Sequence, residues 1–115
     1  MSTPRCSEAE GGRVLFWCPG CEEGHAITVG TWTWNGTINM PTFSPSVLVR
    51  GNQWPRDEFP SYYRPQHASV APGADTVCHS FVTDRRIQFL ADCTHTLAGQ
   101  TVDLPAWPPA SQERP

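Results

Sequence analysis

The 115-residue sequence contains no lysine and no long hydrophobic run. Its eight basic residues are all arginines, and only Arg85 and Arg86 are adjacent. A nucleic-acid-binding surface needs clustered positive charge, so this scatter and the net charge of -3 make a nucleic-acid partner unlikely. No stretch has the length of a membrane-spanning helix, and residues 1–13 lack the apolar core of a signal peptide. We therefore expect a cytoplasmic protein that does not associate with membranes.

Strong helix signals are also missing, whereas turn-forming residues are abundant. The chain has 12 prolines and 9 glycines, and hydrophobic residues make up 38% of it. This mixture favours short strands joined by many turns, and so lean a core commonly needs a disulfide or a metal ion. We predict a mainly β protein, a small antiparallel sheet of hairpins stapled by zinc, with a long irregular loop.

The pattern along the chain predicts one domain with short flanking segments. We expect a disordered leader at 1–12, a single zinc-binding β domain at 13–105 and an extended tail at 106–115. Asn35-Gly36 is a strong hairpin-turn signal, and Asp84-Arg85 joins the clearest pair of strands. The proline-rich stretch 51–76 is predicted to be a loop over a functional site or on the surface. The predicted strands are 13–17, 26–29, 32–34, 37–39, 46–50, 77–83, 86–92 and 101–104.

Five cysteines in a cytoplasmic chain indicate metal ligands or reactive thiols before disulfides. Cys18-Pro19-Gly20-Cys21 has the spacing of a zinc knuckle, in which a two-residue turn directs both thiolates at one tetrahedral ion. A redox pair is the alternative, but such motifs begin a helix, and this one lies between strand-like segments. Cys6, in the polar leader, is the cysteine least expected to take part.

A second pair of ligands is required, and the predicted 77–92 hairpin supplies it. With a two-residue turn, Cys78 pairs with Ala91, and Cys93 lies diagonally from Cys78 on the same face. We therefore predict a zinc site formed by four cysteines: Cys18, Cys21, Cys78 and Cys93. His95 has the same strand parity as Cys93 and is the leading substitute ligand, followed by His25. Whether His79 replaces one of the cysteine ligands stays open. Alternatively, Cys78 and Cys93 are two small buried side chains.

Several segments around the cysteines and histidines resemble a family of small, mostly phage and prophage-encoded proteins that are often labelled "ammonia monooxygenase" without support. The matching segments are FWCPGC with His25, Trp34-Asn35-Gly36, PTFSPS, CHSFV, and the stretch from Ile87 to Leu104. The family usually has glycine in the hairpin turn where this chain has Arg85. More distantly, the sequence is similar to zinc proteins encoded beside bacterial ubiquitin-like conjugation systems. That resemblance implies a peptidase or deconjugating hydrolase in a bacterial or phage-infected cell, acting on a protein or ubiquitin-like substrate.

The hairpin also brings candidate catalytic residues near the predicted metal. His79 lies diagonally from Asp92, as a general base lies beside the carboxylate that orients it, and Ser46 is a candidate nucleophile. His95 is a further catalytic candidate. The plain alternatives are a cross-strand hydrogen bond for His79 and Asp92 and a turn-forming role for Ser46.

Two other functions remain open from the sequence. Zinc with only three protein ligands would be catalytic, with Glu22, Glu23 or Asp92 as the base, although a thiolate-rich site suits a structural role better. A non-catalytic zinc-stabilised module that binds another protein is the alternative to an enzyme. Aromatic residues support it, because aromatic side chains dominate protein interfaces; they are Trp32, Trp34, Trp54, Tyr62 and Tyr63.

Overall fold

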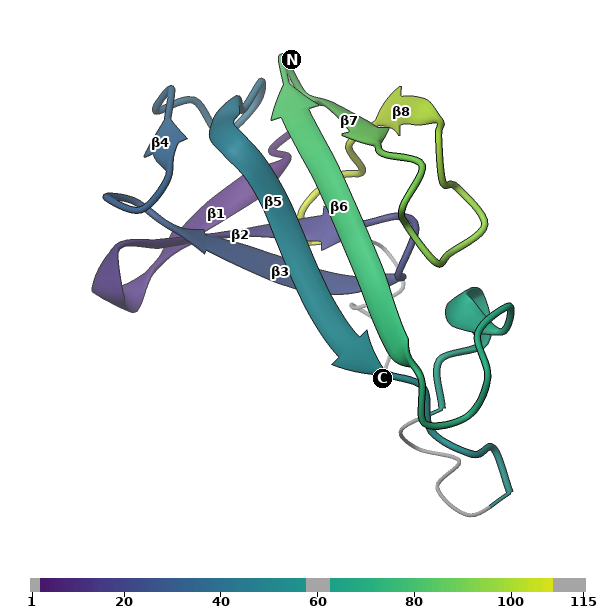
Figure 1. Ribbon diagram of the computed structural model, residues 1–115. Helices are drawn as coiled ribbons and strands as arrows, with labels where there is room; N and C mark the ends of the chain where they lie inside the picture. The colour runs from purple at the N-terminus through teal and green to yellow at the C-terminus, as the bar shows by residue number, and fades with distance from the viewer. Residues whose placement is uncertain (1–2, 58–62, 109–115) are drawn as a thin grey trace.

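Two antiparallel sheets make up the protein, for which a computed structural model describes residues 3–57 and 63–108 (Figure 1). The first sheet has the order β1-β2-β3, and the second has the order β4-β5-β6-β7-β8. The strands are β1 (Cys6–Ala9), β2 (Arg13–Cys18), β3 (Glu23–Thr28), β4 (Thr33–Trp34), β5 (Phe43–Asn52), β6 (Asp75–Thr83), β7 (Arg86–Phe89) and β8 (Thr101–Asp103). Two short 3-10 helices, η1 (Glu10–Gly12) and η2 (Pro65–His67), complete the described elements. The predicted mainly β fold is confirmed.

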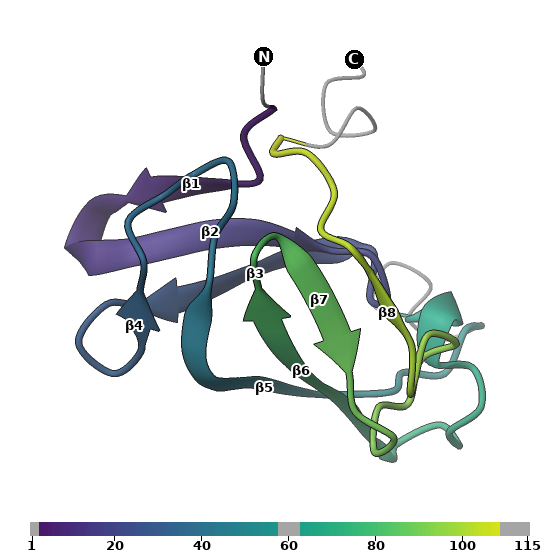
Figure 2. The same ribbon diagram turned by 90° about the horizontal axis from the view of Figure 1, so that it is seen from above.

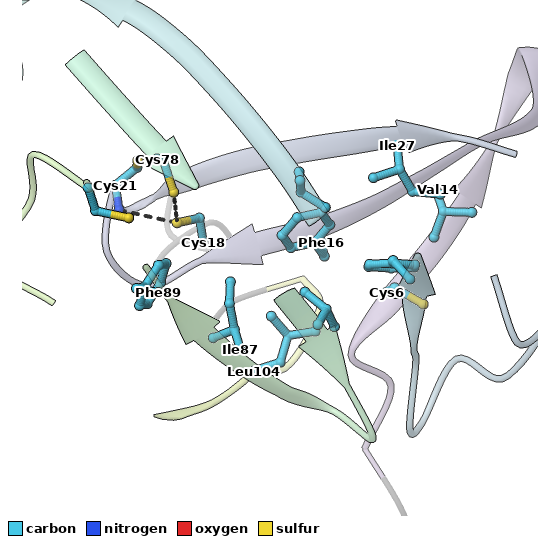
Figure 3. Close-up of a cluster of buried hydrophobic side chains, with 14 residues drawn as sticks. Cys6, Val14, Phe16, Cys18, Cys21, Ile27, Cys78, Ile87, Phe89 and Leu104 are labelled. Carbon is cyan, nitrogen blue, oxygen red and sulfur yellow. Dashed lines mark hydrogen bonds between the residues drawn. The ribbon is translucent and has the colours of Figure 1, made fainter. Parts of the chain in front are cut away.

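The core lies between the two sheets, which cross one another in both ribbon views (Figures 1 and 2). Strand β2 alternates buried and less buried residues, which directs Val14, Phe16 and Cys18 into the core. The ring centroids of Phe16 and Phe43, one from each sheet, are 5.4 Å apart. Figure 3 shows that Cys18, Cys21 and Cys78 continue this apolar layer at one end, so these three candidate metal ligands are part of the core.

The leader predicted to be disordered instead contains β1, which pairs with β2 from Cys6↔Phe16 to Ala9↔Arg13. Cys6 is 1% exposed and packs in the core as a small apolar side chain. This packing accounts for Cys6 without a role as a metal ligand. Burial raises the pKa of the Cys6 thiol to about 11. Parts of the predicted leader, loop and tail (1–2, 58–62 including Tyr62, and 109–115) lie outside the described residues.

The prediction of a hairpin with a two-residue turn at Asn35-Gly36 is wrong. Strand β4 pairs with β5 through Thr33↔Ser44 and Trp34↔Phe43, and no strand forms at 37–39. The Asn35 side chain explains the difference, because its Oδ1 accepts hydrogen bonds from the amides of Thr37 (3.3 Å) and Thr42 (3.2 Å). These bonds hold a wider loop in place of a two-residue turn.

The second predicted hairpin forms at the expected turn. Asp84 and Arg85 both have positive φ (49° and 60°), as a two-residue type I′ turn requires, and Thr83 faces Arg86. Strand β7, however, ends at Phe89 and not at residue 92. The chain turns there, since the Cys93 amide donates to the Leu90 carbonyl at 3.2 Å. This early end changes which residue lies beside Cys18, Cys21 and Cys78.

Candidate active site and metal centre

Four buried side chains from three parts of the chain converge at one end of the core. The ligand atoms of Cys18, Cys21, Cys78 and His95 all lie within 4.8 Å of one another. Cys18 ends β2, Cys21 follows in the turn toward β3, and Cys78 projects inward from β6. In Figure 3 the Cys78 and Cys18 sulfur atoms point at one another, 3.6 Å apart.

The knuckle turn brings its backbone toward the cluster. The Cys21 amide donates to the Cys18 sulfur at 3.3 Å, and the Glu22 amide donates to the Cys18 carbonyl at 2.8 Å. Gly20 is required for space: a β-carbon at this position would overlap the His95 ring. The positive φ in this turn belongs to Glu22 (54°) and not to Gly20.

The electrostatics of the three thiols fit a bound cation. Hydrogen bonds from Cys21 and Cys78 lower the pKa of Cys18, whereas their bonds to Cys18 raise the pKa values of Cys21 and Cys78. The cluster therefore stabilises one thiolate, at Cys18. The negative charge of this thiolate opposes ionisation of the other two thiols. A divalent cation would remove this opposition, since metal binding deprotonates its thiol ligands.

The histidine in the cluster carries a second sign of a metal site. His95 is 4% exposed, and its Nε2 is buried without a hydrogen-bond partner among the described residues. Burial lowers the pKa of His95, which favours the neutral ring that binds metals. The Leu97 amide contacts Nδ1 at 3.2 Å. A metal on Nε2 would place the ring proton on Nδ1, which could then no longer accept this hydrogen bond from the Leu97 amide. Three thiols and one imidazole at these distances can hold a metal ion.

The structure does not bring Cys93 into this cluster, which corrects the predicted four-cysteine set. The extrapolation from Cys78 assumed that the β6–β7 ladder continues to residue 92, but β7 ends three residues earlier. Beyond the turn, His95 occupies the position expected of Cys93. The Cys93 sulfur instead contacts the backbone of His79, accepting from its amide and donating to its carbonyl, each at 3.2 Å.

His67 is a site residue that the sequence reasoning missed. It lies in η2 within the proline-rich loop, is 1% exposed, and places Nε2 3.3 Å from the Cys21 sulfur. Its Nδ1 lies 2.5 Å from the Thr94 hydroxyl, and burial lowers its pKa. With Cys21 ionised on a metal, Nε2–H would donate to that sulfur and orient it. No spacing to the cysteines reveals His67, because its approach depends on how the loop folds.

Buried Gln53 holds the loop that carries His67. Its side-chain amide donates to the carbonyls of Arg64 (3.0 Å) and His67 (2.9 Å), and its Oε1 accepts from the Arg64 amide (3.1 Å). Arg64 also pairs with Glu23 at 2.7 Å, which links the loop to β3. The predicted loop over a site therefore packs against the cysteine cluster.

His25 forms a second, overlapping group with Cys21 and Glu23 that could hold a metal ion. Its Nδ1 lies 3.2 Å from the Gly24 carbonyl, and its Nε2 is buried without a hydrogen-bond partner among the described residues. Glu23 is already paired with Arg64, and this group has fewer thiols. The cluster with His95 is therefore the stronger candidate metal centre.

On the outer face of the five-stranded sheet, which contains β5 and β6, three polar side chains form a hydrogen-bonded series. His79 Nε2 lies 2.9 Å from Ser46 Oγ, and His79 Nδ1 lies 3.1 Å from Asp92 Oδ2. With the ring proton on Nδ1, His79 donates to Asp92 and accepts from the Ser46 hydroxyl. The His79 side chain is 25% exposed and that of Asp92 is 56% exposed, so the series is open to a large molecule. His95 is not part of it, since it lies in the buried cluster.

Strand β6 connects the two groups, because neighbouring residues of a strand point to opposite faces. Cys78 points into the core toward the cysteines, while His79 points outward toward Ser46. Cys93 binds the His79 backbone from the chain segment that carries Asp92. The cluster therefore anchors both elements that present His79 and Asp92.

Ser46 lies in an irregular part of β5. The β5–β6 register shifts between Phe43↔Val82 and Val47↔Ser80, so extra residues on β5 bulge from the ladder. Bulges re-aim side chains and are over-represented beside active sites. The Ser46 carbonyl accepts a hydrogen bond from the Trp32 indole at 3.1 Å, which fixes this bulge against the 29–34 segment.

The fold and these two groups define the class: a mainly β protein with a buried Cys/His cluster and an outward-facing Ser–His–Asp series. The sequence model of the family BubE, described as "Bacterial ubiquitination-like system serine protease", matches residues 3–90. The chain belongs to this family, which confirms the similarity to proteins of bacterial ubiquitin-like systems. The match includes Ser46, His79 and three of the cluster cysteines, whereas Asp92 and His95 lie beyond it.

Searches of curated proteins and of solved structures found no significant match. Within the described residues, no helix is long and apolar enough to cross a membrane.

Proposed function

We propose that this protein is a serine peptidase that cleaves a protein or ubiquitin-like substrate, with a structural zinc ion holding its catalytic residues. The observation that carries the proposal is the hydrogen-bonded order Ser46–His79–Asp92, at 2.9 Å and 3.1 Å. Nucleophile, base and orienting carboxylate in this order form the arrangement used by serine proteases on unrelated folds. The description of the family as a serine protease supports the same function.

The geometry assigns a role to each of the three residues. Ser46 Oγ attacks the carbonyl carbon of the scissile peptide, and His79 Nε2 takes the hydroxyl proton as the new C–O bond forms. His79 then gives this proton to the leaving nitrogen as the C–N bond breaks. Water attacks the acyl–Ser46 ester, His79 accepts its proton, and that proton returns to Ser46 Oγ as the acid leaves. Asp92 fixes the His79 tautomer and stabilises the imidazolium.

The metal that best fits the cluster is zinc, held by Cys18, Cys21, Cys78 and His95. A set of three thiolates and one imidazole is a common tetrahedral zinc site, and a filled set of four suits a structural role. Bound zinc would supply fixed geometry where the two sheets meet. The four side chains are buried, whereas the Ser–His–Asp series faces outward. We therefore place the chemistry at Ser46 and not at the metal.

The proposal is tested by labelling purified, zinc-loaded protein with a fluorophosphonate, a small reagent that reacts with activated serines. We expect the wild type to be labelled at Ser46 and to cleave ubiquitin-like fusion proteins. Ser46→Ala should lose labelling and cleavage, and His79→Ala should lower cleavage by roughly 10⁴-fold or more. Ser44→Ala is the matched control, because Ser44 is an exposed serine two residues away with no contact to His79 described.

Three results separate the parts of this proposal. Cleavage that survives in Ser46→Ala would overturn the serine mechanism. A wild type that folds and binds zinc but neither reacts nor cleaves would favour the non-catalytic interaction module. Elemental analysis should find one zinc per chain, and protein that is folded and active without zinc would contradict the structural metal.

A further inference from the structure

The side of β5 that faces away from β6 is an open sheet edge that begins at Ser46. Strand β5 pairs with β6 from Val47 to Asn52 on one side, but on its other side β4 covers only Phe43 and Ser44. Figure 1 shows β6 beside the whole length of β5 and β4 beside only its beginning. Among the described residues, none forms a backbone hydrogen bond to this side of β5 beyond Ser46.

The alternation of backbone hydrogen bonds along β6 and β5 identifies which backbone groups of β5 face the open edge. The Leu90 amide donates to the His79 carbonyl at 2.9 Å, so the backbone of His79 faces β7. The backbone of its neighbours Cys78 and Ser80 then faces β5, because the direction alternates along an antiparallel strand. Opposite these two residues, Val49 and Val47 bond to β6. The N–H and C=O groups of Leu48 and Arg50 therefore point to the open side.

Two further contacts agree with this parity. The Gln53 amide donates to the Ala74 carbonyl at 2.8 Å, which continues the series of odd-numbered β5 residues that bond toward β6. The Ser46 carbonyl accepts from Trp32, which lies on the open side. The edge thus has backbone groups at Leu48 and Arg50 that pair with no described residue, directly after a residue whose side chain contacts His79.

We propose that this edge binds the substrate as an added β-strand, with an extended peptide segment pairing with Leu48 and Arg50 and its scissile bond at Ser46. This inference rests on the proposed function. Unpaired edge groups are a ready template for an extended chain, and main-chain hydrogen bonds would give affinity for many sequences. From Leu48 to Asn52 the edge spans roughly 13 Å, which accommodates about four substrate residues.

Side chains at the edge predict which segments bind best. Leu48 is 43% exposed, and Arg50 is exposed without an ion pair to any described residue. Both belong to the face of β5 that also carries the Ser46 side chain, because they lie two and four residues from it. Substrate residues opposite them are two positions apart. We expect an apolar residue opposite Leu48 and an acidic residue opposite Arg50.

The backbone contacts are tested on the wild-type enzyme with a fluorogenic hexapeptide carrying leucine and glutamate two positions apart. In a series of analogues, each peptide nitrogen of the hexapeptide is methylated in turn. Methylation at alternate positions should lower kcat/KM roughly tenfold, the loss of about one hydrogen bond, and at the intervening positions it should change kcat/KM little. Uniform sensitivity, or none, would overturn the added strand.

The side-chain preference is tested by exchanging charge. Replacing the glutamate of the peptide by lysine should lower kcat/KM for the wild type, and Arg50→Glu should reverse this preference. Arg86→Glu is the matched control, because it makes the same charge change at an exposed site on β7 of the same sheet. An unchanged preference in Arg50→Glu would remove Arg50 from the contact.

Fluorophosphonate labelling separates this inference from the proposed function, because the small reagent reaches Ser46 without an extended strand. If Ser46 is not labelled, both are overturned. If Ser46 is labelled and the methylation pattern is absent, only the strand inference fails. A concentration-dependent dimer that Leu48→Pro abolishes, measured by analytical ultracentrifugation, would assign the edge to a second copy and overturn the substrate role.

Discussion

At the scale of single residues, the candidate metal centre depends on side chains that the cysteine spacing does not specify. The spacing of Cys18 and Cys21 predicts half of the site, but the fourth position belongs to His95, which was expected only as a substitute. His95 fits because Gly20 has no β-carbon. The glycine of the knuckle therefore acts through close packing more than through backbone freedom.

Replacing Gly20 by alanine should weaken the metal centre. The added methyl group would overlap the His95 ring, which would have to leave its place beside the three cysteines. We expect zinc affinity to fall roughly tenfold or more, by analogy with changes that displace a ligand's supporting contacts. Competition with a chromogenic zinc chelator measures this. Gly24→Ala is the control, because an added β-carbon there would come no closer than 3.4 Å to any neighbour, and equal affinity in wild type and Gly20→Ala would contradict the argument.

At the scale of elements, strand β6 joins the two candidate sites by its alternation. Cys78 and His79 are adjacent in sequence, yet one faces the buried cluster and the other faces Ser46. The segment after β7 follows the same division, since it supplies His95 to the cluster and Asp92 to the outer face. Cys93 lies between them in the sequence, and its sulfur contacts the His79 backbone at hydrogen-bond distance.

A matched pair of variants separates the metal ligand from its neighbour in this segment. Cys93→Ala should retain one zinc per chain, because its sulfur is not in the cluster. It should lower the rate of fluorophosphonate labelling, since both of its contacts to the His79 backbone are lost. His95→Ala should lose zinc. Elemental analysis and labelling kinetics measure the two effects, and loss of zinc in Cys93→Ala would restore the four-cysteine set.

At the scale of the whole molecule, the Cys/His cluster joins segments that are distant along the chain. It connects the β2–β3 knuckle of one sheet with β6 of the other and with the segment after β7. The proline-rich loop is added through His67, which contacts Cys21. A bound metal would therefore stabilise the contact between the sheets and, through β6, the position of His79.

Removing the metal should destabilise the fold and the active site together. Without the cation, three closely packed thiols share one negative charge. The free energy of metal binding, which adds to the folding stability, is also lost. We expect chelation to lower Tm by more than about 10 °C and to abolish labelling of Ser46, with both restored by added zinc. Differential scanning calorimetry and labelling on the same samples provide the measurement. Full labelling of metal-free protein would show that the Ser46 site is independent of the metal.

Local rules predicted much of the architecture, because they depend on residues close in sequence. Short apolar segments between turn signals predicted strands near β2, β5 and β6, and the two-residue turn at Asp84-Arg85 predicted the β6–β7 register. The same rules were wrong at Asn35-Gly36, where side-chain bonds of Asn35 hold a wider loop. They also missed β1, whose polar residues gave no pattern and whose pairing with β2 depends on the buried Cys6.

The sequence by itself determined the mainly β class, the Cys18–Cys21 knuckle and the choice of His79, Asp92 and Ser46 as candidates, since each follows from composition, spacing or strand parity. Only the tertiary structure decided that His95 and not Cys93 joins the cluster, that His67 supports it, and that β5 has an open edge beside Ser46. The physical reason is that these features depend on where β7 ends, how the proline-rich loop packs and how far β4 extends along β5. Those are contacts between distant segments, which no local pattern records.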